Sequence, residues 1–232
     1  MSNTLHVDGT NFRAFKILIA AEYNGMDINV PEFKGDAAFK ALSPMGRVPV
    51  LETASGCITS SNAIARYVGG SNQTTGLNGV TYFESAQVDS WMDFATNEIE
   101  TSATVWYYPA FGYMDANAAA IDMAKKNLTS ALTALNKHLA DKTYLVGNAI
   151  TLADISVASA LVYPFKFVAD ASFRKPFGHV MRWFDLCVNQ PQFQAIIGDV
   201  TLCKTEIKAD ATPITVTGNK GGNKKEKGDK KE

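Results

Sequence analysis

The chain has 232 residues, of which 46% are hydrophobic, and its formal net charge at neutral pH is −1. This length and composition are those of a globular protein that can bury one large core or two smaller ones. No apolar run reaches the about 18 residues that a membrane-spanning helix needs, and the first residues lack the basic and apolar regions of a signal peptide, so we expect a cytoplasmic protein with no membrane association.

The first 70 residues alternate short apolar segments with helical patterns. Apolar residues from Phe12 to Ile19 recur at helical spacing, and the pattern stops near Gly25, a residue type that ends helices. Short apolar runs bounded by turn residues predict strands. We therefore expect the order β-α-β-α-β-β-α, with strands near residues 5–7, 28–31, 48–52 and 56–59 and helices near 12–24, 36–42 and 61–68.

The segment from Val48 to Ser61 carries the strongest sign of a ligand site. Pro49 stands at the entrance of a strand, where its missing N–H is tolerated, and a cis Val48-Pro49 bond would leave the backbone of Val48 free to pair with a ligand. The hydroxyls of Ser60 and Ser61 would cap the next helix, whose N-terminus attracts a carboxylate. A small extended peptide with a free carboxylate, such as glutathione, fits these requirements.

The rest of the chain predicts a helical half after a linker. Residues 71–79 are rich in Gly, Ser, Asn and Thr and predict a junction. Beyond them, helices are expected from about residue 83, over 118–139, from 151 and from about 176. Leucines at 128, 132, 135 and 139 lie four, three and four residues apart, which places them on one face of a helix. The helical half is expected to cover residues 80–210.

Thr151 and Asp154 form a predicted capping box. The Thr151 hydroxyl can accept from the backbone N–H of Asp154, and the Asp154 carboxylate can accept from the backbone N–H of Thr151. The helix that follows is almost entirely apolar, which predicts that it is buried on all sides. Asp154 could be mistaken for a catalytic acid, but its position is fully explained by a structural cap.

The last residues, 211–232, are interpreted as a disordered, Lys-rich linker. Residues 219–232 hold six Lys, two Glu and one Asp and no apolar side chain, so they cannot offset the entropy cost of ordering. A tail that binds nucleic acid is the alternative, but the interleaved acids argue against it, and we expect no direct nucleic-acid binding.

The cysteines and histidines predict no metal site. Cys57, Cys187 and Cys203 are odd in number and far apart, which also argues against a disulfide framework and agrees with a reducing cytosol. The three histidines are isolated and show no ligand spacing.

These motifs resemble two related families. The Val-Pro strand followed by Ser-x-Ala-Ile, and the buried helix with its capping box, are similar to the cytosolic glutathione transferase fold. Further segments resemble the gamma subunits of translation elongation factor 1B; they lie at residues 12–16, 144–147, 151–155, 182–184, 189–193 and 198–203. The resemblance covers roughly residues 3 to 210 and implies an α/β thioredoxin-like domain over residues 1–70 and an all-α domain over residues 80–210.

The same resemblance implies a function and partners. It implies a glutathione transferase-like scaffold subunit in the nucleotide-exchange complex of elongation factor 1, supporting peptide chain elongation, with the exchange subunits as partners. A homodimer and glutathione as a ligand are further expectations, and no cofactor is required. The alternative is an active glutathione transferase that conjugates glutathione to electrophiles.

The predicted site departs from an active transferase at two points. The stretch before Arg13 has no Ser or Tyr to stabilise a thiolate, so Thr10 is the catalytic candidate, with Asn11 as an amide donor to glutathione; Thr10 is alternatively a simple helix cap. Ser60 replaces the Glu or Gln that usually contacts the γ-glutamyl amine, while Ser61 can still bind the γ-glutamyl carboxylate. Arg47 either contacts the ligand, as Val48 and Pro49 do, or is a solvated surface charge.

Overall fold

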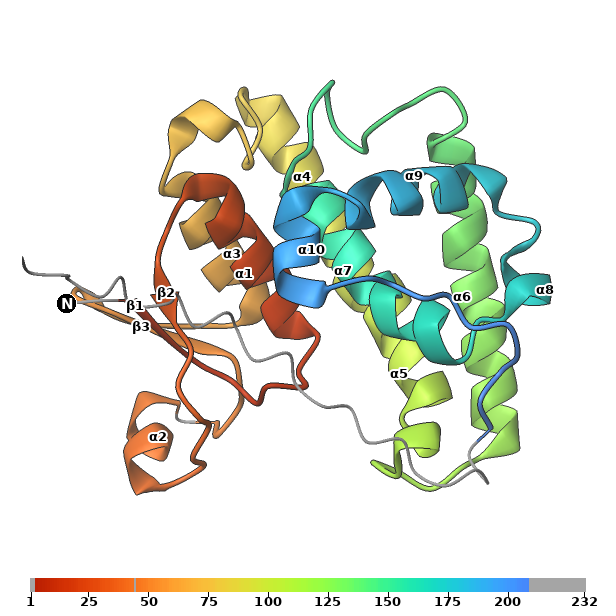
Figure 1. The fold of residues 1–232 in the computed structure, drawn as a ribbon, viewed down its shortest axis with the longest axis horizontal. Coiled ribbons are helices and arrows are strands. Elements are labelled where there is room, and N and C mark those ends of the chain that lie inside the picture. The colour runs from red at the N-terminus through yellow and green to blue at the C-terminus, as the bar shows by residue number, and fades with distance from the viewer. Residues whose placement is uncertain (1–2, 44, 209–232) are drawn as a thin grey trace, which may run out of the picture.

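The computed structural model describes residues 3–43 and 45–208, and the predicted linker at 211–232 lies outside this range. The first half is a four-stranded sheet with helices packed on it (Figure 1). The strands follow the order β2-β1-β3-β4 across the sheet, and they are β1 (Asn3–His6), β2 (Ile28–Asn29), β3 (Val50–Thr53) and β4 (Gly56–Thr59). The helices are α1 (Arg13–Asn24), α2 (Ala37–Leu42) and α3 (Ser61–Gly70). This order of elements confirms the predicted thioredoxin-like arrangement.

The register of the sheet brings the predicted site residues to one edge. β1 pairs antiparallel with β3, with His6 opposite Val50, and β3 pairs antiparallel with β4, with Val50 opposite Thr59. The end of β1, the start of β3 and the end of β4 therefore meet at the same edge. The loop at residues 8–12, the Val48-Pro49 pair and the Ser60-Ser61 pair all continue from these strand ends.

The Val48-Pro49 peptide bond is cis, as predicted. The bounds of two strands differ from the prediction. The third strand begins at Val50 and not at Val48, because Pro49 has no N–H to donate to the ladder. The second strand is only Ile28–Asn29, shorter than the expected 28–31, and Pro31 likewise cannot extend it.

The second half is a helical domain, as predicted (Figure 1). Its helices are α4 (Tyr82–Phe94), α5 (Thr101–Tyr107), α6 (Ala118–His138), α7 (Leu152–Phe167), α8 (Ala171–Arg174), α9 (Gly178–Val188) and α10 (Pro191–Ile197). A six-residue π-helical segment, η2 (Ala95–Glu100), joins α4 to α5, and short 3₁₀ turns are η1 (Gln73–Thr75) and η3 (Pro109–Phe111). The helix expected from about Pro176 begins two residues later, at Gly178. Within the described residues, no helix is long and apolar enough to cross a membrane.

The predicted capping box at Thr151 and Asp154 is present and does more than cap α7. Both reciprocal contacts of the box are formed. The fully buried Asp154 carboxylate also accepts from the backbone N–H of Leu145 and from the indole N–H of Trp183, both at 2.9 Å. Burial raises the pKa of Asp154, and these hydrogen bonds oppose that rise. One carboxylate therefore ties α7 to the preceding loop and to α9.

A buried group of charges joins the two halves, and sequence patterns did not reveal it. Lys16 on α1 and Glu100 at the end of η2 are each 1% exposed, and the Lys16 ammonium lies 3.1 Å from the Glu100 carboxylate. Arg13 donates to the other Glu100 oxygen at 2.9 Å, and Lys16 also donates to Asn62 on α3 at 2.9 Å. Burial lowers the pKa of Lys16, and Glu100 partly restores it. The sheet half and the helical half are thus connected by an ion pair in their shared interior.

Candidate functional site

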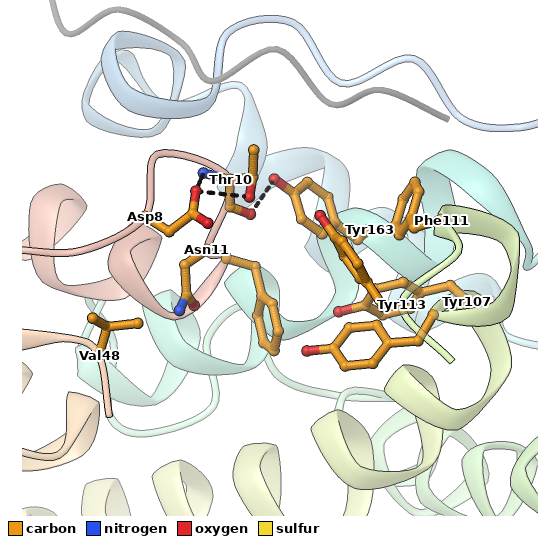
Figure 2. A pocket seen from close by; sticks show the side chains of 10 residues that line it. Asp8, Thr10, Asn11, Val48, Tyr107, Phe111, Tyr113 and Tyr163 are labelled. Carbon is orange, nitrogen blue, oxygen red and sulfur yellow. Dashed lines mark hydrogen bonds between the residues drawn. The ribbon is translucent and has the colours of Figure 1, made fainter. Parts of the chain in front are cut away.

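A cavity of about 200 Å³ lies between the loop after β1 and the helical half. Figure 2 shows the loop residues on one side and aromatic side chains of the helical half on the other. Its lining consists of Asp8, Thr10, Asn11, Phe12, Val48, Tyr107, Tyr108, Phe111, Tyr113 and Tyr163. A small concave site with an aromatic wall and a few polar groups at one side has the features of a ligand pocket.

The loop that carries Thr10 is held by its own side chains. Both the backbone N–H and the hydroxyl of Thr10 donate to one carboxylate oxygen of Asp8, at 3.1 Å each. The side-chain oxygen of Asn11 accepts from the backbone N–H of Arg13 at 3.0 Å. Asn11 and not Thr10 therefore supplies the oxygen at the start of α1, so the interpretation of Thr10 as a helix cap is wrong. The catalytic role of Thr10 stays a prediction, and its hydroxyl proton is engaged by Asp8.

Tyr163 connects the loop to the helical half. Its hydroxyl donates to the backbone carbonyl of Thr10 at 3.0 Å, and this bond is drawn in Figure 2. Its ring packs edge-on against Phe12 and Phe15, with ring centroids 6.2 and 5.5 Å apart. Burial raises the pKa of Tyr163, so the hydroxyl remains a neutral donor. The loop is thus fixed relative to α7.

The N-terminus of α3 is not capped by the serines. Ser60 has a φ of 72°, and its side chain makes no capping hydrogen bond. A capping residue needs an extended backbone to aim its oxygen at the N–H groups of the first turn, so the predicted serine cap is wrong. Of the described residues other than glycine, Ser60 alone has a positive φ. Such strained residues cluster at ligand sites, and the first N–H groups of α3 are left without a side-chain acceptor.

The structure gathers the predicted site residues at one edge but not in one cavity. Thr10, Asn11 and Val48 line the cavity, whereas Arg47, Pro49, Ser60 and Ser61 lie outside its lining. Arg47 is exposed, and its backbone is held on both sides by the hydroxyl of Ser43. A contact between the Arg47 side chain and the ligand therefore stays a prediction.

Sequence reasoning missed the aromatic wall of the cavity. Tyr107, Tyr108, Phe111 and Tyr113 come from a short stretch at the end of α5 and after it, and Tyr163 comes from α7. The density of aromatic residues at 106–113 was a usable signal, but nothing in the sequence places this stretch opposite the loop at residues 8–12. Among the described residues, no three His, Cys, Asp or Glu side chains gather in a way that could hold a metal ion.

Two family models match this chain. The N-terminal domain of glutathione S-transferase matches residues 4–70, and the C-terminal domain of glutathione S-transferase matches residues 99–191. The two matches together cover more than half of the chain.

The curated relatives carry a more specific name. Over 218 residues, the chain is 42% identical to elongation factor 1-gamma-A of Xenopus laevis, a match that covers 90% of this chain and 49% of the relative. Over 206 residues, it is 45% identical to probable elongation factor 1-gamma 1 of Arabidopsis thaliana, covering 86% of this chain and 50% of the relative. The chain thus spans about half the length of the curated relatives it matches.

Solved structures share the fold. The glutathione transferase-like domain of elongation factor 1-gamma from Saccharomyces cerevisiae matches with a TM-score of 0.76 and 20% identity, covering 89% of this chain and 98% of that chain. A theta-class glutathione S-transferase from Xanthomonas axonopodis pv. citri, solved with glutathione bound, matches with a TM-score of 0.73 and 23% identity, covering 86% of this chain and 99% of that chain. At these identities the likeness establishes the glutathione transferase fold alone.

Proposed function

Because the chain belongs to the glutathione S-transferase family and is similar over most of its length to elongation factor 1-gamma, we propose that it is a glutathione transferase-like scaffold subunit of the elongation factor 1 nucleotide-exchange complex. The observation that carries this proposal is the 40–45% identity to elongation factor 1-gamma of animals and a plant. In this role the protein works in the cytoplasm, holds the exchange subunits and supports peptide chain elongation.

The structure offers a surface for such a partner at the start of α4. Val80, Tyr82 and Phe83 are 78%, 99% and 73% exposed, and we call these three residues the neck patch. Neighbouring exposed apolar side chains are characteristic of interaction sites, because water contact with them is unfavourable. A groove lies beside the patch, between the end of α3 and the start of α4, and Val80 and Tyr82 line it. We infer that the neck patch contacts the N-terminal part of an exchange subunit.

Replacing Tyr82 and Phe83 together with Ser should weaken binding to a purified exchange subunit by at least tenfold, since aromatic anchors contribute most of the energy of such interfaces. Size-exclusion chromatography and calorimetry at micromolar concentrations would measure this. Met123→Ser is the matched control, because Met123 is an exposed apolar residue on α6, away from the patch. Independent elution of the parent chain would contradict the scaffold role, and unchanged binding by the double variant would contradict the role of the patch.

A homodimer is a second proposal for the same surface. The exposed aromatic residues of the neck patch could pack against their copies about a twofold axis, as in the self-complementary interfaces of symmetric dimers. Light scattering on the parent and the Tyr82/Phe83 double variant, without an exchange subunit, distinguishes this from the partner interface.

We also propose that glutathione is a weak ligand at the edge where the strands end. Support comes from Val48, which lines the cavity, and from the strained Ser60 and the uncapped N-terminus of α3, where the γ-glutamyl carboxylate would bind near Ser61. The short Ser60 side chain offers no charge for the ligand's amine. The alternative of an active transferase has no specific observation in its favour, because the Thr10 hydroxyl is bonded to Asp8.

Ser61→Ala should weaken glutathione binding about fivefold, corresponding to about 1 kcal/mol for one lost hydrogen bond to a carboxylate. Ser60→Glu should tighten binding by a similar factor if a charge-assisted bond to the amine forms. Calorimetry on the parent and both variants tests this, with Ser90→Ala on the exposed side of α4 as the control. Equal affinity for Ser61→Ala and the parent would rule out this site.

A further inference from the structure

The last described residues, 199–208, form a strap that is fixed to the outside of the helical half. Figure 1 shows the strap in blue, running from α10 across α7 toward α6. The backbone N–H of Ile207 donates to the carbonyl of Phe167, the last residue of α7, at 2.9 Å. The Glu206 carboxylate accepts from the indole N–H of Trp106 on α5 at 2.7 Å. The chain therefore leaves the described body at a fixed place beside the C-terminal end of α7.

This place lies close to a group of exposed apolar side chains. The Phe167 ring packs edge-on against Phe111, with ring centroids 5.0 Å apart, and Phe111 packs against Tyr113 at 5.8 Å. Tyr113 also packs edge-on against Tyr108 at 5.4 Å. Tyr113 is 61% exposed, and Met114, which follows it, is 45% exposed. We call Tyr108, Tyr113 and Met114 the aromatic rim. Neighbouring apolar side chains that remain in contact with water are characteristic of interaction sites.

The residues that follow the strap lie outside the described range, and their sequence is not uniform. Residues 219–232 have no apolar side chain, whereas Pro213, Ile214 and Val216 stand shortly before them. Ile214 and Val216 are two positions apart, so an extended chain places both on one side. A proline and β-branched residues favour such an extended chain. The segment 212–217 therefore has the chemistry of a strand-like peptide that can cover an exposed apolar surface.

The aromatic rim is within reach of this segment. Ile214 comes seven residues after Ile207, and seven residues can span up to about 23 Å when extended. The two successive ring contacts from Phe167 to Tyr113, at 5.0 and 5.8 Å, cover a shorter path. A short tether also gives the segment an effective concentration of about 1 mM at the rim. A second copy of the chain or an exchange subunit lacks this advantage, so the observations favour the segment of the same molecule.

We propose that residues 212–217 dock on the aromatic rim of the same molecule, with their apolar side chains against the rings of Tyr108 and Tyr113. The contact removes apolar surface from water on both sides, which is the driving force for such docking. The Lys-rich stretch that begins at residue 219 then leaves the body at the rim and not at the end of the strap. The contact needs neither glutathione nor an exchange subunit.

Site-specific photo-crosslinking in the full chain of 232 residues tests this contact. Ile214 is replaced by p-benzoylphenylalanine, an apolar residue that crosslinks to nearby C–H bonds under ultraviolet light, and mass spectrometry identifies the crosslinked peptides. We expect crosslinks within one molecule that fall mainly on residues 108–114. The same label at Lys227 is the control for the tether alone. Its yield on residues 108–114 should be lower by about fivefold or more, because only chance encounters bring it to the rim.

A second pair of variants tests whether the rim itself holds the segment. Tyr113→Ser in the chain labelled at position 214 should lower the crosslink yield on Tyr108 and Met114 by about threefold or more, since apolar contact area is lost. Met123→Ser removes an exposed apolar side chain on α6 outside the rim and should leave this yield unchanged. A melting curve confirms that both variants are folded.

Each other outcome overturns the proposed contact. Crosslinks that join two molecules, in place of crosslinks within one, would show that the rim binds a second copy. Equal yields from positions 214 and 227, or crosslinks spread over the body without preference for the rim, would show that the segment has no binding site there. An unchanged yield in Tyr113→Ser would show that the segment passes the rim without binding to it.

Discussion

Asp154→Ala should lower the free energy of unfolding by about 3–5 kcal/mol. The carboxylate accepts from the backbone N–H groups of Leu145 and Thr151 and from the indole N–H of Trp183, all of them in the buried interior. Each donor left without an acceptor costs about 1–3 kcal/mol, and the total falls below the simple sum because water can enter the space that the carboxylate leaves. For a chain of this size the melting temperature should fall by roughly 8–15 °C.

Thermal and urea unfolding of two further variants make this test specific. Asp154→Asn keeps one oxygen for Leu145 and Trp183 but turns an amide N–H toward the N–H of Thr151, so its loss should be intermediate. Asp170→Ala is the matched control, because Asp170 caps the short α8 and is only partly buried. Its loss should be much smaller. Similar losses for Asp154→Ala and Asp170→Ala would show that Asp154 acts only as a local cap.

The sequence patterns predicted local structure well where one segment contains its own explanation. The capping box needs only residues three apart, and the apolar α7 follows directly, so both were predicted and confirmed. The same applies to the strand and helix order of the first half, because each element has its own periodicity and turn signals.

Contacts between distant segments were not predictable in this way. Trp183 lies 29 residues after Asp154, and neither residue signals the other in sequence. The Lys16–Glu100 pair spans 84 residues, and a lysine in an amphipathic helix pattern is expected to be solvated. Tyr107 and Tyr163 meet the loop after β1 only because the two halves pack together.

The candidate site was predicted in part for the same reason. The register of β1, β3 and β4 brings Thr10, Asn11 and Val48 to one edge, and the local motifs are enough to identify them. The conformations there were not predictable from residue types. Ser60 adopts a positive φ and does not cap, and Asp8 takes the Thr10 hydroxyl. Residue type thus identified the place but not the hydrogen-bonding roles.

Glu100→Gln should cost about 3 kcal/mol or more of unfolding free energy, because it leaves the Lys16 ammonium buried without its counter-charge. Removing one partner of a buried ion pair typically costs about 3–5 kcal/mol. Lys16→Met should cost less, since Glu100 keeps Arg13 at 2.9 Å. Asp89→Asn, which breaks the half-exposed pair of Arg66 and Asp89, is the control and should cost about 1 kcal/mol or less.

The double variant Lys16→Met with Glu100→Gln decides whether the pair itself matters. With both charges gone, nothing charged is left stranded, so its loss should be smaller than the sum of the single losses by about 1–3 kcal/mol. Additive losses in urea unfolding would mean that Lys16 and Glu100 contribute independently, and the ion pair would then have no role in joining the two halves.

The pH dependence of stability tests the same pair by a second route. Burial lowers the pKa of Lys16 in the folded protein below its ordinary value of 10.5. Between the lowered pKa of the folded state and 10.5, the unfolded chain therefore binds more protons than the folded protein does. The contribution of Lys16 to stability therefore rises with pH through this window and is lost as pH falls through the folded pKa. Subtracting the pH profile of Lys16→Met from that of the parent isolates this contribution. In Glu100→Gln the pKa of Lys16 should fall further, because its counter-charge is gone, and the rise should begin at lower pH. A parent-minus-Lys16→Met difference that is flat below pH 10.5 would contradict the lowered pKa of this lysine.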